Sequence, residues 1–132
     1  MLIEIMEQFT IRIAGFGLPD EFITDSLGLN ALNVNRKGEI WNIRTGKCYE
    51  ENIIFVKDKT TYESGFEEAL DRLIVLFNSC PMISELFTKC SYKELQIWAS
   101  MGDEKLVPSI HLSPEHVLFL SSINAHIDID II

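Results

Sequence analysis

Residues 64–77, SGFEEALDRLIVLF, decide the fold class, because they contain the longest amphipathic helix that the sequence predicts. Ser64 and Glu67 have the spacing of a capping box, in which the serine oxygen accepts a backbone N–H and the glutamate reaches back. Apolar residues then follow the i, i+3, i+4 spacing of one helical stripe: Phe66, Ala69, Leu70, Leu73, Ile74 and Phe77. We therefore expect one face of this helix to pack on a sheet and the other to contact water.

Strand patterns flank this helix on both sides. Residues 9–14 alternate apolar and polar side chains with the period of a half-buried strand. Strong turn residues at 37–38 and 45–46 separate the strands that follow. The other strands are expected at residues 32–35, 39–43, 52–59, 95–99, 107–112 and 127–131.

Further helices are expected at three places. Pro19 and two acidic residues favour a short helix over about residues 19–27, which Gly28 ends. Pro81 ends the main helix or begins the next one, and a helical pattern continues to about Lys89. Ser113 is a good N-cap for a helix that begins at Pro114.

The expected order of elements is β-α-β-β-β-α-β-β-α-β, which indicates an α+β fold. In such folds the helices pack on one face of a mixed, largely antiparallel sheet. The 132 residues fit one domain, and no linker-like stretch divides them. We therefore expect residues 1–132 to form a single domain.

The net charge restricts the classes of partner. Eleven basic and twenty acidic side chains give a formal charge of −9. This charge repels a nucleic acid backbone or an anionic membrane surface and attracts a basic protein. We therefore expect a basic protein as the partner, with no nucleic acid and no membrane, although acidity that serves only solubility explains the same numbers.

The sequence shows no signal for export or for membrane insertion. Residues 1–7, MLIEIME, lack the basic flank of a secretory signal, and no apolar run reaches the roughly 20 residues of a membrane span. Three cysteines without a CxxC pair fit neither a disulfide framework nor a zinc site. A cytoplasmic protein with reduced thiols is expected.

No pattern for catalysis or for a cofactor is complete. Gly15-Phe16-Gly17 follows a strand, but Asp20 stands where a dinucleotide-binding loop has its third glycine, so a plain turn is the better reading. The three histidines, His111, His116 and His126, lack the spacing of a helical metal pair. We therefore expect no enzyme, no cofactor and no metal site.

Two acidic clusters are the candidate partner-binding residues. Asp128 and Asp130 alternate with isoleucines on the closing strand, so they point the same way. Glu67, Glu68 and Asp71 lie on the exposed side of the main helix. Each cluster is also what a solvated surface looks like, and the sequence does not choose between them.

Three stretches resemble the opening of the bacterial domain-of-unknown-function family 4279: residues 9–15 (FTIRIAG), residues 19–29 and residues 36–39 (RKGE). The ending, from residues 112–115 to the alternating acids of residues 126–131, resembles that family too. A tryptophan expected on the strand before the main helix is replaced by Ile54-Phe55. The resemblance implies a small α+β domain with no established enzymatic activity, some of whose relatives look like toxin immunity proteins.

The functional expectation is a non-enzymatic immunity protein that neutralises a basic, nuclease-like toxin by direct binding. The alternative is a small-molecule-binding module. Its pocket would lie between the sheet and the helices, lined by phenylalanines, Trp98 and Met101.

Overall fold

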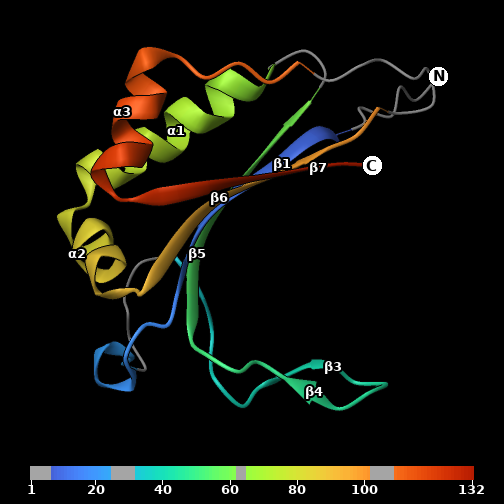
Figure 1. Cartoon of the computed structure of the whole chain (residues 1–132), viewed down its shortest axis with the longest axis vertical. Coiled ribbons are helices and arrows are strands. Elements are labelled where there is room, and N and C mark those ends of the chain that lie inside the picture. The colour runs from blue at the N-terminus through green and yellow to red at the C-terminus, as the bar shows by residue number, and fades with distance from the viewer. Residues whose placement is uncertain (1–6, 25–31, 62–64, 102–108) are drawn as a thin grey trace.

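The computed structural model describes residues 7–24, 32–61, 65–101 and 109–132. Within these ranges a five-stranded sheet carries three α-helices, and a separate two-stranded hairpin extends from it (Figure 1). The expected α+β fold is confirmed.

The central strand of the sheet is β1 (Glu7–Phe16), which pairs antiparallel with a neighbour on each side. The strand order is β2-β5-β1-β6-β7. The last pair, β6 and β7, is parallel. A parallel pair needs a crossover connection, and α3 (Pro114–Ser122) lies between these two strands in the chain. The other strands of the sheet are β2 (Asn33–Asn35), β5 (Ile53–Thr61), β6 (Tyr92–Ala99) and β7 (Ala125–Ile131).

The three helices all lie on one face of the sheet (Figure 1). They are α1 (Gly65–Ser79), α2 (Pro81–Lys89) and α3 (Pro114–Ser122). The predicted stripe of α1 is buried from Phe66 to Phe77, with Ile74 half-buried at its margin. It packs on the inner side chains of the sheet, which include Ile11, Ile54 and Ile97.

The hairpin is formed by β3 (Ile40–Asn42) and β4 (Lys47–Cys48) and projects on the side of the sheet away from the helices (Figure 1). Its turn is held by Asn42, whose side-chain Oδ1 accepts from the backbone N–H of Arg44 at 3.1 Å. The sequence predicted β3 and the turn at residues 45–46, but it did not predict β4, which has only two residues.

The helix expected over residues 19–27 is wrong in its described part. Only a 3₁₀ turn, η1 (Asp20–Phe22), forms there, and the next residue, Ile23, is extended. Pro19 precedes the turn and offers no side-chain cap. Asp20 instead accepts a hydrogen bond from Asn52 Nδ2 at 2.6 Å, and the same amide donates to Leu18 O at 2.9 Å. These long-range bonds hold the segment against β5, and residues 25–27 lie outside the described part.

The strand expected over residues 107–112 is also wrong where the structure describes it. Residues 109–112 have no strand pairing. Ile110 and Leu112 are half-buried against the core, and His111 contacts Glu67, so side chains rather than a hydrogen-bonded ladder fix this segment. Residues 107 and 108 lie outside the described part, as does Ser64 of the predicted capping box.

Candidate binding surface

The face of the sheet opposite the helices combines aromatic rings with charges. Strand alternation and the pairing registers put these side chains there, because residues directly opposite each other on paired strands share one face of the sheet. We call this surface the outer face. It includes Arg12, Phe16, Phe55, Lys57, Tyr92, Glu94, Gln96, Trp98, His126, Asp128 and Asp130.

Arg12 is the central cation of the outer face. Its guanidinium carbon lies 4.6 Å from the centroid of the Phe55 ring and 5.4 Å from that of Trp98. Its Nε donates to Oε1 of Gln96, the residue directly opposite on β6. Burial lowers the pKa of Arg12, but a guanidinium stays protonated in proteins. The result is a fixed cation between two aromatic rings, and it holds Trp98 in place.

Tyr92 anchors the other end of the outer face. Its ring stacks on His126, with centroids 4.5 Å apart and an interplanar angle of 17°. It also makes an edge-to-face contact with Phe16, with centroids 5.7 Å apart. The phenol donates a hydrogen bond to Glu94 Oε2 at 2.8 Å. This hydrogen bond is the main reason why the pKa of Tyr92 is raised.

Acidic side chains run beside these aromatic residues. Asp128 lies next to Gln96 and Asp130 next to Trp98 in the pairing of β7 with β6, and Glu94 lies next to His126. Asp128 and Asp130 are exposed, whereas Glu94 is half-buried. The predicted common orientation of Asp128 and Asp130 is therefore seen in the structure, on a surface that also carries a tryptophan and a tyrosine.

A groove of about 520 Å³ continues the outer face toward the hairpin. Phe16 and Ile53 form its floor on the sheet, and Trp41 and Lys47 line it from β3 and β4. Trp41 is 52% exposed, so its ring is open to a ligand or partner.

The second predicted cluster lies on α1, in the helical layer, so the structure does not bring the two clusters together. Asp71 is already bonded, because its Oδ1 lies 2.6 Å from Nε2 of His116. The other ring nitrogen of His116 accepts the Ser113 backbone N–H at 3.1 Å, so Nε2 carries the proton and donates to Asp71. Oε1 of Glu67 contacts Nδ1 of His111. Among the described residues, Glu68 has no such contact with the segment that leads into α3.

Several outer-face residues were missed or misplaced by sequence reasoning. Trp98 was expected in a pocket between sheet and helices, but Ile97 and Ala99 are the core residues and Trp98 points to the opposite face. The alternation of Tyr92, Glu94, Gln96 and Trp98 along β6 was the available signal for it. The position of Arg12 between two rings depends on the registers of three strands, which the sequence does not reveal.

The described residues contain no group of three or more histidine, cysteine or acidic side chains that could hold a metal ion. None of their helices is long and apolar enough to cross a membrane.

The model of one protein family, described as Domain of unknown function (DUF4279), matches residues 4–132. The chain belongs to this family. The resemblance to DUF4279 is therefore confirmed over essentially the whole chain. No curated protein and no solved structure matches the chain. At the position where the resemblance leads us to expect a tryptophan, Phe55 of this DUF4279 domain packs against Arg12 on the outer face.

Proposed function

We propose that this DUF4279 domain is a cytoplasmic protein-binding domain that captures a basic partner on its outer face. The partner would be a nuclease-like toxin, which makes the domain an immunity protein. The observation that carries the proposal is the arrangement of Trp98 and Tyr92 beside Asp128 and Asp130 on one sheet face. Aromatic residues and arginine dominate binding energy at protein interfaces, and charges around them select the partner.

Preorganisation supports the choice of this surface. Trp98 is held by Arg12, and Tyr92 is held by His126 and Glu94, so little side-chain freedom is lost when a partner binds. The acidic side chains on α1 are less suitable, because Asp71 and Glu67 are engaged with histidines of the segment that leads into α3. The net charge of −9 would attract a basic partner to either surface.

The test is co-expression with the product of the gene directly upstream, followed by purification and titration calorimetry of any complex. Asp130→Lys on the outer face should weaken the complex at least about tenfold, because it reverses a charge at the interface. Glu85→Lys is the matched control, since it makes the same change of charge at an exposed position on α2. Association should slow as salt is raised.

Three results would contradict the proposal. A harmless neighbour that does not bind removes the immunity function. Equal effects of Asp130→Lys and Glu85→Lys remove the outer face as the site. A loss of binding in Glu68→Lys instead would assign the partner to α1.

The groove beside the hairpin favours a second candidate function, the binding of a small molecule. Phe16, Ile53 and Trp41 offer apolar contacts, and Lys47, Glu50 and Glu51 offer charged groups of both signs for the polar part of a ligand. A thermal-shift screen of metabolites tests this function: a hit that Trp41→Ala abolishes supports it, and no stabilisation by any class refutes it.

A further inference from the structure

The strand β7 lies at the edge of the sheet, and no other described strand pairs with its outer side. Just beyond β7, Ile132 donates its N–H to Ala99 O at 2.8 Å and accepts from the N–H of Met101 at 3.3 Å. Both backbone groups of Ile132 therefore point toward β6. Because backbone groups alternate along a strand, those of Ile127, Ile129 and Ile131 point to the outer side of β7.

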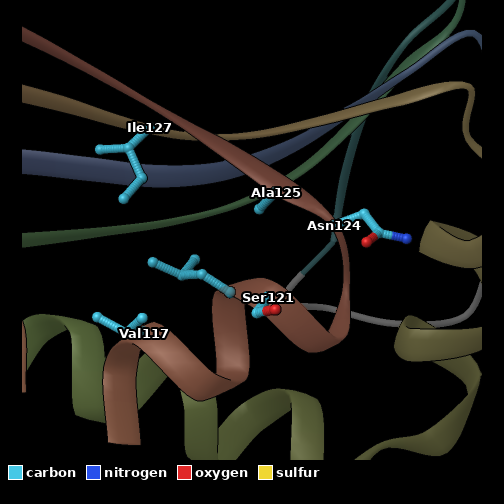
Figure 2. A pocket seen from close by; sticks show the side chains of 6 residues that line it. Val117, Ser121, Asn124, Ala125 and Ile127 are labelled. Carbon is cyan, nitrogen blue, oxygen red and sulfur yellow. The ribbon is translucent and has the colours of Figure 1, made fainter. Parts of the chain in front are cut away.

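The helix side of this edge is hollow and largely apolar, with Ser121 and Asn124 at the end of the hollow near the start of β7. A groove of about 350 Å³ lies between α3 and β7, with Val117 on one wall and Ile127 on the other (Figure 2). Val117 is 51% exposed, and Ile127, Ile129 and Ile131 are 43%, 44% and 57% exposed. An additional strand beside β7 would place every second side chain over this groove and these isoleucines.

The opposite side of the same edge is acidic. Asp128 and Asp130 point to the outer face, so an added strand would bring its other side chains next to two carboxylates. Lysine or arginine at those positions complements the carboxylates. The two sides of β7 together select a strand that alternates apolar and basic residues.

A second copy of the chain fits this edge poorly. Two β7 strands could pair antiparallel with their helices on the same side of the joined sheet. The acidic side of one strand would then lie next to the acidic side of the other, so aspartates would meet aspartates. If the helices lay on opposite sides, aspartates would meet isoleucines. Charge therefore favours a basic partner over self-association.

We infer that β7 accepts an extended segment of a partner as a sixth strand of the sheet, with apolar residues on the α3 groove and basic residues on Asp128 and Asp130. Strand addition of this kind takes affinity from backbone hydrogen bonds and specificity from alternate side chains. The inference names how the basic partner is bound and rests on the proposed function in that respect.

The first experiment uses two fluorescent heptapeptides of the same composition, one with alternating valine and lysine and one with the lysines in a block. We expect the alternating peptide to bind at least about tenfold more tightly in an anisotropy titration, a factor that corresponds to about 1.4 kcal/mol. Equal binding of the two peptides would overturn strand addition, because charge alone then explains the affinity.

Two variants locate the peptide. Ile129→Pro removes an outward N–H without touching the β6 pairing, and edge strands tolerate proline at such positions. Val117→Glu puts a charge on the exposed wall of the groove and leaves the sheet unchanged. Each should weaken the alternating peptide at least about tenfold. Unchanged binding in Val117→Glu would overturn the inference even where Ile129→Pro fails to fold.

The same variants separate this inference from the proposed function. If a toxin complex forms and Val117→Glu does not weaken it, the immunity function is supported and strand addition is rejected. If the domain binds the alternating peptide more tightly than the block peptide but forms no toxin complex, the strand site is supported and the immunity function is rejected. A dimer in light scattering that Ile129→Pro dissociates would assign the edge to a second copy and overturn the inference.

Discussion

Replacing His116 with alanine is expected to lower the free energy of unfolding by about 3 kcal/mol, although His116 lies outside the proposed binding surface. The side chain is 3% exposed and bonds two segments: Nε2 donates to Asp71 on α1, and Nδ1 accepts the Ser113 N–H at the start of α3. A hydrogen bond to a charged group contributes about 1.5–3 kcal/mol, toward the low end here because Asp71 is 65% exposed and can be rehydrated. Loss of the cap and the cavity left by the ring add about 1–2 kcal/mol.

Urea and thermal denaturation followed by circular dichroism measure the effect, and 3 kcal/mol corresponds to a fall in melting temperature of about 10 °C. His111→Ala is the control, because His111 also pairs with an acidic side chain of α1, Glu67, but both side chains are more than half exposed. Exposed pairs contribute about 0–1 kcal/mol. If His116→Ala costs no more than His111→Ala, the buried histidine does not join α3 to α1 as argued.

Three further predictions concern the packing and the protonation of single groups. Gly15→Ala should destabilise the fold by about 1–3 kcal/mol, because its methyl group would lie 2.6 Å from Cys90 Sγ; if adding Cys90→Ala restores no stability in urea denaturation, Cys90 is not the obstacle. Burial raises the pKa of the Cys90 thiol to about 11, so Cys90 should react with a disulfide reagent at pH 8 far more slowly than the exposed Cys48, and equal rates would contradict this. The pKa of Tyr92 is raised mainly by its hydrogen bond to Glu94, so that bond stabilises the fold below the ordinary tyrosine pKa of about 10 and is lost as the pH rises through the folded value. An ultraviolet titration in which Glu94→Gln leaves the ionisation of Tyr92 unchanged would reject that assignment.

The parts of the fold that the sequence predicted correctly depend on local periodicity. The alternation from Phe9 to Ile13 and the stripe from Phe66 to Phe77 each report a buried face directly. The helix expected after Pro19 failed because its outcome depends on Asn52, which lies more than thirty residues away in the chain. No local pattern contains that contact.

The candidate surface was predictable only in part, for a related reason. Asp128 and Asp130 share a face by simple alternation, so their common orientation followed from the sequence. The cation site at Arg12 needs β5 and β6 in the correct register on both sides of β1, and strand registers are long-range properties. Trp98 was placed on the wrong face because its apolar ring was assumed to be core, whereas Arg12 and Asp130 are its neighbours.

The two tryptophans of the chain give it a pair of intrinsic fluorescent reporters, one at each candidate site. Trp98 lies beside Arg12 and is half-buried, so acrylamide should quench it slowly. Trp41 is exposed on the hairpin and should account for the quickly quenched, red-shifted emission. A partner that covers the sheet would change the protected component, and a small molecule in the groove beside the hairpin would change the accessible one. The intrinsic fluorescence of the unlabelled protein therefore distinguishes its two candidate activities, because each changes the emission of a different tryptophan.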